Sequence, residues 1–361
     1  MEVNSMQQDE MTPLKRAEAI SAGKPVDRLP FAPLLGDTAS HIVDASVSNY
    51  HHSAKIMTEV EFAVYQRFGQ DGVGVGPGYS GLAEAFGTKL SFPENDIPFV
   101  KEPALQDWSD LYGREPVNPK KAGRMPIFLE ALQILKDRLG QEVPVGSFIG
   151  GPLTVASFIR GTDQLLRDLA KNPEKVHDLM QLVTDSALLY IDAVADLDCG
   201  ISIADPVASG TLISPKNFRE FVKPYLKQYA DHVCARTGSG PMLHICGNTT
   251  RIWQDMVETG AATLSLDNVV DMGEAKELVG STVCLMGNVD PVNIIAKGSK
   301  EEIYSAVERC FCQAGDNSKG FILSSGCQIP IGTPLDNIQH FADASRIFGS
   351  QAAILAQKLK S

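Results

Sequence analysis

The chain has 361 residues, of which 43% are hydrophobic and 21% charged, a balance that is ordinary for a globular enzyme with a large core. Its formal net charge is −12 and no basic stripe is visible, so we expect no nucleic-acid partner. We also expect no membrane span, since no run of about 20 apolar residues exists. The segment MEVNSMQQDEM lacks a secretory signal pattern, and the seven cysteines are an odd number, which together favour reduced thiols and a cytoplasmic location.

Short apolar runs of about strand length recur along the chain, and most of them end in Gly, Pro, Asp or Cys. There are eight such runs: Pro30–Leu35, Gly72–Gly76, Val143–Phe148, Gly200–Asp205, Pro241–Cys246, Ala262–Asp267, Thr282–Gly287 and Gly320–Ser325. Amphipathic patterns that predict helices lie between them: Lys55–Phe68, Arg124–Leu139, Pro173–Val194, Pro215–Val233, Lys300–Phe311 and Leu335–Leu359.

Strands that alternate with helices predict a parallel sheet, and eight strands are the number that closes a (β/α)₈ TIM barrel. We therefore predict an α/β fold with a single barrel domain over residues 1–361, with N-terminal helical additions. Residues 1–29 form an N-terminal extension, and residues 77–142 form an insertion of extra helices. An open doubly wound sheet is the alternative, and the lack of a glycine-rich phosphate loop after the first run disfavours it.

Metal-binding residue types gather where the predicted strands end. His244 and Cys246 are two residues apart, so on a strand their side chains point to the same face. Cys327 follows the last apolar run, and all three would meet at one rim of a barrel. One His and two Cys are typical zinc ligands, and three protein ligands leave a position for substrate. Asp267 could fill that position or orient His244, and the alternative for the whole set is a buried histidine with structural cysteines.

Other polar residues at predicted strand ends are further candidates. Asp205, before Pro206, could bind a substrate or cap the next segment, and Asn288 could bind a ligand or form a turn. Glu84 is an acid among apolar neighbours shortly after Tyr79. We assign candidate catalytic roles to Asp267, Asp205 and Glu84, and candidate cofactor-binding roles to Asn288 and Tyr79.

Several segments together resemble the uroporphyrinogen decarboxylase superfamily, and specifically its corrinoid-dependent methyltransferase branch. The resemblance is greatest to the methylcobamide:coenzyme M methyltransferases, and it covers almost the whole chain. It implies a (β/α)₈ barrel, and it implies that His244, Cys246 and Cys327 are zinc ligands. The segments that carry it are Lys24–Pro30, Gly123–Pro126, Ile203–Ser209, Leu243–Gly247, and Gly326–Cys327 with Thr333–Asn337.

The resemblance implies an enzyme that moves a methyl group between a corrinoid on a partner protein and a small thiol or a methylated or methoxylated substrate. Zinc would activate the thiol or the leaving heteroatom, and either direction of transfer, as well as a monomer or a homodimer, is compatible with the sequence. A decarboxylase of tetrapyrrole synthesis is the alternative, but the region Leu34–Asp44 contains no arginine for a polycarboxylate substrate. A non-catalytic zinc- or cobamide-binding protein is a third possibility. Asp267 stands where the coenzyme M enzymes tend to carry glutamate.

Overall fold

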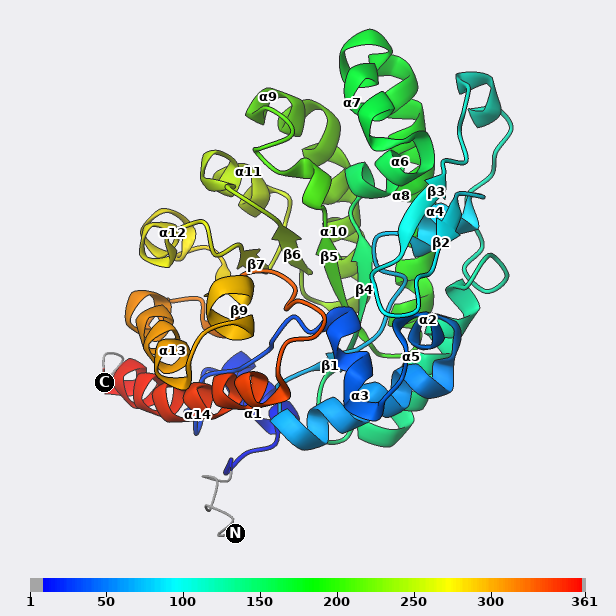
Figure 1. Ribbon diagram of the computed structural model, residues 1–361. Coiled ribbons are helices and arrows are strands. Elements are labelled where there is room, and N and C mark those ends of the chain that lie inside the picture. Colours follow the sequence, from blue (N-terminus) through cyan, green and yellow to red (C-terminus); the bar gives the residue numbers. More distant parts are fainter. Residues whose placement is uncertain (1–8, 359–361) are drawn as a thin grey trace.

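A curled sheet of parallel strands forms the centre of the molecule in the computed structural model, which describes residues 9–358 (Figure 1). Seven strands are hydrogen-bonded in the order β1-β4-β5-β6-β7-β8-β9, and every neighbouring pair is parallel. Their bounds are β1 Val73–Gly74, β4 Val145–Gly150, β5 Gly200–Ala204, β6 Met242–Ile245, β7 Thr263–Leu266, β8 Cys284–Val289 and β9 Phe321–Ser325. Because all seven strands run the same way, their carboxyl ends meet at one rim.

Seven of the eight predicted strands are confirmed, and the first apolar run is the exception. Phe31 forms only an isolated parallel bridge with Leu323 of β9. The amide of Ala32 donates to the Leu323 carbonyl, and the Leu323 amide donates to the carbonyl of Pro30. Pro30 has no N–H group to extend this ladder, and the Leu34 amide donates to the hydroxyl of Ser325 instead of a strand carbonyl, so the run pairs at one residue only. The prediction of a closed eight-stranded barrel is therefore confirmed in part, as a seven-stranded curled parallel sheet.

Helices follow the strands and lie on the outer side of the curled sheet (Figure 1). The predicted helix entries are confirmed where proline stands in the first turn, and the Ser214 hydroxyl accepts from the Asn217 amide as a cap. The α-helices are α1 Pro13–Ser21, α2 Val47–His52, α3 Ala54–Phe68, α4 Gly81–Ala85, α5 Met125–Leu139, α6 Pro152–Arg160, α7 Thr162–Lys171, α8 Pro173–Ala195, α9 Pro215–Asn217, α10 Lys223–Thr237, α11 Trp253–Glu258, α12 Met272–Val279, α13 Lys300–Ala314 and α14 Leu335–Lys358. The last residue of the predicted helix Leu335–Leu359 lies outside the described residues.

Six short helical segments with 3₁₀ or π geometry complete the described elements. They are η1 Gly36–Val43, η2 Trp108–Leu111, η3 Pro206–Ala208, η4 Phe218–Val222, η5 Thr250–Ile252 and η6 Pro291–Ala296. In the described residues, no helix combines the length and the apolar character that crossing a membrane requires.

The segment 77–142 contains an element that the sequence prediction missed. Alongside α4, η2 and α5 it forms an antiparallel hairpin of β2 (Lys89–Ser91) and β3 (Phe99–Glu102). The turn-forming residues of Pro93–Pro98 between two short runs are the sequence signal for that hairpin. The prediction of helices alone was therefore incomplete there.

The N-terminal extension is held against the sheet by buried ion pairs; residues 1–8 of the predicted extension lie outside the described part. Arg16, which has no exposed surface, is paired with Asp27 at 2.8 Å and also with Asp71. Arg28 pairs with Asp71 at 2.6 Å and with Asp9 at 2.7 Å. Asp71 lies two residues before β1, so this network closes the amino-terminal end of the sheet, away from the rim where the strands end.

Candidate metal centre

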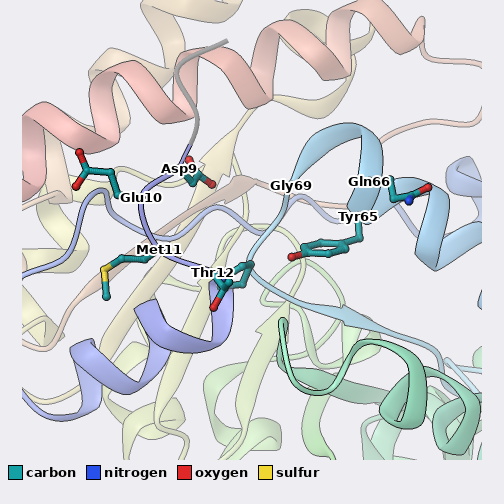
Figure 2. Close-up of a pocket in the computed structure, with 8 residues that line it drawn as sticks. Asp9, Glu10, Met11, Thr12, Tyr65, Gln66 and Gly69 are labelled. Carbon is teal, nitrogen blue, oxygen red and sulfur yellow. The ribbon is translucent and has the colours of Figure 1, made fainter. Parts of the chain in front are cut away.

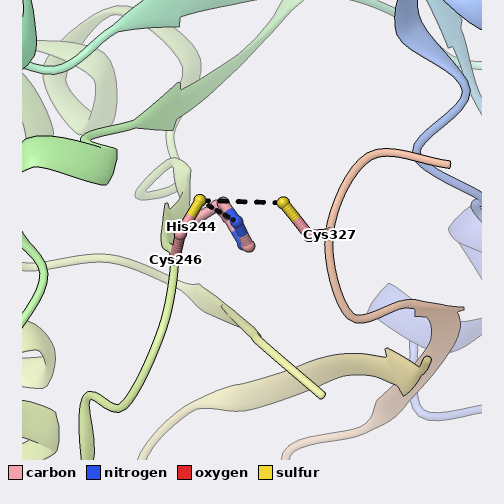
Figure 3. Close-up of side chains that lie close together, drawn as sticks. All are labelled: His244, Cys246 and Cys327. Carbon is pink, nitrogen blue, oxygen red and sulfur yellow. Dashed lines mark hydrogen bonds between the residues drawn. The ribbon is translucent and has the colours of Figure 1, made fainter. Parts of the chain in front are cut away.

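His244, Cys246 and Cys327 lie together at the carboxyl ends of the strands (Figure 3). His244 is the third residue of β6, Cys246 follows the end of that strand, and Cys327 lies two residues beyond β9. Nε2 of His244 is 3.2 Å from the Cys246 sulfur, and the two sulfurs are 3.7 Å apart. Their donor atoms all lie within 4.8 Å of one another, which places the three predicted ligands in one cluster.

The ring of His244 is held by the neighbouring strand β7. Its Nδ1 lies 3.1 Å from both the carbonyl oxygen and the hydroxyl oxygen of Ser265. A carbonyl oxygen only accepts, so Nδ1 carries the proton and donates it. Nε2 therefore keeps its lone pair and faces the sulfur of Cys246, as a metal-binding imidazole must. Ser265 was missed by the sequence analysis, although it is two residues before Asp267 and so faces the same way on the strand.

The spacing of the donors fits a zinc ion. Two thiolates bound tetrahedrally at about 2.3 Å from one ion are about 3.8 Å apart, and an imidazole nitrogen and a thiolate are about 3.6 Å apart. The sulfurs of Cys246 and Cys327 are separated by 3.7 Å, and the nitrogen and sulfur by 3.2 Å. The side chains could therefore take up such an ion with shifts of a few tenths of an ångström.

The two sulfurs are 3.7 Å apart, close enough for one thiol to donate a hydrogen bond to the other. The hydrogen bond between the two thiols, with a further contribution from His244, lowers the pKa of Cys327 to about 4 although burial opposes this. The same pairing, together with burial, raises the pKa of Cys246. One sulfur is thus already a thiolate near neutral pH, which is the form that binds metals.

Asp267 lies just beyond the end of β7, and both of its carboxylate oxygens are engaged by backbone amides. Oδ2 accepts from the Gly247 amide at 2.7 Å, and Oδ1 accepts from the Val269 amide at 3.2 Å. The cluster of metal-capable donors found in residues 9–358 does not extend to it. Asp267 is therefore next to the centre and bound to the turn that follows Cys246.

Asn288 and Asp205 are buried in the rim by hydrogen bonds to the protein itself. The Asn288 side-chain amide donates to the carbonyls of Asp267 and Val270, each at 2.9 Å. Asp205 accepts from the amides of Leu153 and Thr154 and from the Thr154 hydroxyl at 2.6 Å, so it caps α6. Burial raises the pKa of Asp205 to about 6.

Tyr79 lies in the loop beyond β1, close to the end of β4, with its ring edge-on to Phe148 at 5.2 Å between centroids. Burial, followed by the negative charges of Cys246 and Cys327, raises the pKa of its hydroxyl. Gly78, the residue before it, forms a parallel bridge with Ile149 of β4, so this candidate lies near the carboxyl end of that strand.

Glu84, on α4, forms an ion pair with Arg124 at 2.8 Å. The Arg124 guanidinium also donates to the carbonyl of His51, and it stacks over the ring of Phe92 at 4.4 Å from the centroid. Arg124 thus joins α2, α4 and the start of α5. The sequence analysis did not single out Arg124 as a partner of Glu84, because the pairing spans 40 residues.

A cavity of about 390 Å³ lies away from these residues, between the N-terminal segment and the end of α3 (Figure 2). None of the candidate site residues lines it. Its lining residues are Asp9, Glu10, Met11, Thr12, Pro13, Tyr65, Gln66 and Gly69.

A curled parallel sheet with a His-Cys-Cys donor cluster at its carboxyl ends defines an α/β protein of the barrel type with a candidate metal centre. The chain belongs to the uroporphyrinogen decarboxylase (URO-D) family, whose model matches residues 12–348. The family resemblance inferred from the sequence is therefore confirmed.

Methyltransferases of methanogens are among its relatives. The chain is 29% identical over 341 residues to the methylated-thiol–coenzyme M methyltransferase of Methanosarcina mazei, covering 93% of this chain and 90% of that protein. It is 28% identical to the methylcobamide:CoM methyltransferase MtaA of Methanosarcina barkeri, over 91% of this chain and 96% of that protein. A solved structure described as a methyltransferase from Methanosarcina mazei superposes with a TM-score of 0.84 at 28% identity, covering 94% of this chain and 99% of the other.

Proposed function

We propose that this protein is a zinc-dependent methyltransferase that moves a methyl group between a protein-bound corrinoid and a small thiol or methylated substrate. The observation that carries the proposal is the cluster of His244, Cys246 and Cys327, whose donor atoms have zinc-like spacing at the strand ends. The names of the relatives, which act on methylcobamide or methylated thiols and coenzyme M, support it.

When bound by these three side chains, zinc supplies a Lewis acid that favours the thiolate form of a coordinated thiol or polarises the leaving heteroatom of a methylated substrate. The protein contributes a histidine whose tautomer is set by Ser265 and two cysteines that supply negative charge. In thiol methylation, a carbon–sulfur bond forms while the cobalt–carbon bond breaks and its electron pair stays on cobalt. Demethylation is the reverse, and a small thiol or a methylated or methoxylated compound is the proposed second substrate.

The remaining candidates have proposed roles around this centre. Tyr79 is half-buried near the end of β4, and its hydroxyl has a raised pKa and so keeps its proton, which is why we assign it a hydrogen bond to the reacting substrate. Glu84 and Asp205 are already bound to Arg124 and Thr154, and Asn288 to the turn after β7. For these three we propose that they shape the rim on which substrate and corrinoid bind.

The corrinoid must approach the strand ends, so we propose that its carrier protein docks on that face. Three exposed apolar side chains support a protein partner there: Leu212, Val269 and Val292, which follow β5, β7 and β8.

The test combines metal content with methyl transfer. Zinc per chain is measured in the wild type, in Cys327→Ser and in the control Cys312→Ser, whose thiol is exposed on α13. The proteins are then mixed with methylcobalamin and a panel of thiols, and separately with Co(I) cobalamin and methyl thioethers or ethers, and the corrin spectrum is followed. We expect one zinc per chain and methyl transfer in the wild type and in Cys312→Ser, and loss of both in Cys327→Ser.

Full zinc occupancy in Cys327→Ser would contradict the ligand set. Zinc binding without methyl transfer to or from any of these compounds would contradict the function and favour a binding protein. Turnover of uroporphyrinogen by metal-free protein would favour the decarboxylase alternative instead.

A further inference from the structure

We infer that Asp267 is a positioning residue: it and the turn Asp267–Val270 hold the three metal ligands in place, while the fourth metal position is left to substrate. This inference rests on the metal centre of the proposed function and replaces the expectation that Asp267 fills that position at rest. The turn contributes no ligand itself, yet it contacts the segments that carry all three.

The carboxylate of Asp267 holds the turn that contains Cys246. Its Oδ2 accepts from the amide of Gly247 at 2.7 Å, the residue directly after that ligand. Gly247 has a φ of +75°, a conformation that a residue with a side chain rarely adopts, so the chain turns sharply here. Oδ1 accepts from the Val269 amide at 3.2 Å, so both oxygens have backbone partners. Coordination of a metal by either oxygen would compete with a charge-assisted hydrogen bond.

The segments that carry His244 and Cys327 also contact β7 and the turn Asp267–Val270. His244 donates from Nδ1 to Ser265, two residues before Asp267 on β7. On the far side, Gly326 precedes Cys327 and lies against Asn268, where an added Cβ would be only 2.3 Å from the Asn268 amide nitrogen. Glycine is thus required at 326 for the backbone of the third ligand to approach the turn.

Asn288 fixes the turn from the opposite side. Its side-chain amide donates to the carbonyls of Asp267 and Val270, the first and last residues of the turn. Both Asn288 and Asp267 are less than 10% exposed, so water does not replace these bonds. The turn is therefore bound at both ends and rigid enough to orient the ligands.

The variant Asp267→Asn tests the inference, because asparagine keeps the shape but offers one acceptor oxygen to two backbone amides. Zinc affinity is measured by competition with a chelator in the wild type, in Asp267→Asn and in Asp271→Asn. Asp271 is the matched control, since it caps α12 four residues later and accepts from Glu274 and Gln313 rather than from the ligand segments. Cobalt(II) is also substituted for zinc, and its absorption spectrum is recorded at saturation without and with 2-mercaptoethanol.

We expect Asp267→Asn to weaken zinc binding by at least fivefold, since the loss of a residue that orients metal ligands typically costs about 10- to 100-fold in affinity. Its saturated cobalt spectrum should match that of the wild type before and after the thiol is added, and Asp271→Asn should keep wild-type zinc affinity. A cobalt spectrum that changes in Asp267→Asn before thiol is added would overturn the inference, as would a loss of zinc affinity smaller than fivefold.

A second measurement uses the wild type alone, in case Asp267→Asn does not fold. The electron paramagnetic resonance of the cobalt protein is recorded in water enriched in oxygen-17, and we expect line broadening from a water at the fourth position. Absence of broadening would mean that a protein group holds that position and would overturn the inference. These readouts need no methyl transfer, so a wild type that binds zinc but transfers no methyl group would refute only the proposed function.

Discussion

Nδ1 of His244 lies 3.1 Å from the carbonyl oxygen of Ser265, so a neighbouring strand that contributes no ligand fixes the tautomer of the metal-binding imidazole. The Ser265 hydroxyl lies at the same distance and is the part of this contact that mutation can remove. Ser265→Ala should therefore raise the zinc dissociation constant by up to about tenfold, because the carbonyl remains as an acceptor.

Chelator competition measures this constant, with Ser324→Ala as the control. Ser324 is an equally buried serine on β9, but its hydroxyl donates to the carbonyl of Ala32. Equal losses of zinc affinity in the two variants would contradict a specific role for Ser265.

The ion pairs at the other end of the sheet predict a loss of stability in acid. Burial opposes the charge of Asp27, but the Arg16 guanidinium and the amides of Met11 and Arg28 lower its pKa below the ordinary value. An acid with a lowered folded-state pKa stabilises the protein above its unfolded pKa of 3.8, and this contribution is lost as the pH falls through the folded pKa. Asp27→Asn should destabilise the protein by about 3 kcal/mol at pH 7, since Arg16 loses a buried partner.

Urea unfolding at pH 7 and at pH 3 measures that difference. We expect the difference in free energy of unfolding between the wild type and Asp27→Asn to be smaller at pH 3, because the wild-type carboxylate also gains a proton. A gap of the same size at both pH values would show that Asp27 acts through its shape rather than its charge.

Glu61 on α3 predicts the opposite effect, a loss of folded-state stability as the pH rises. Burial raises its pKa to about 7, and its carboxylate accepts one hydrogen bond, from the Gly74 amide at 3.2 Å. An acid with a raised folded-state pKa destabilises the protein as the pH rises from its unfolded pKa of 4.5 through the folded value. The change in the free energy of unfolding caused by Glu61→Gln should therefore be about 2 kcal/mol more stabilising at pH 8 than at pH 5. Thermal unfolding of both proteins at the two pH values checks this, and an unchanged difference would contradict the assigned titration.

The strands and the ligand cluster could be predicted because both follow from local patterns. Apolar runs of strand length predicted seven strands, and the i, i+2 spacing of His244 and Cys246 put two ligands on one face. Cys327 could be added because parallel strands end at a common rim. The first run failed to become a full strand because Pro30 removes an N–H group that a ladder needs, a signal that was present in the sequence, and because the Leu34 amide donates to the Ser325 hydroxyl.

The positions of Asp267, Asn288 and Arg124 could not be predicted in the same way. The partners of the two side chains at the β7 turn are backbone groups of other loops, and Arg124 meets Glu84 across 40 residues. Strand-end location predicts that such groups are near a site but does not say whether they face the ligand or the protein. Hydrogen-bond partners decide that, and they depend on how the loops pack.

The hydroxyl of Tyr79 is predicted to act as a neutral hydrogen-bond donor in the reaction. Burial, together with the charges of Cys246 and Cys327, raises the pKa of its hydroxyl well above the ordinary value of 10. The hydroxyl therefore keeps its proton at working pH and can donate a hydrogen bond but not act as a base. Tyr79→Phe should lower the rate constant of methyl transfer about tenfold, as expected for the loss of one hydrogen bond to a charged group.

Single-turnover methyl transfer followed at pH 6 to 10 measures this effect, with zinc content determined on the same samples. We expect zinc content to be unchanged in Tyr79→Phe and the shape of the pH profile to match the wild type, because a group that does not titrate leaves no inflection. An alkaline inflection present in the wild type and absent in Tyr79→Phe would mean that the hydroxyl loses its proton in this range. It would then act as a base, and the assignment of Tyr79 as a neutral donor would be wrong.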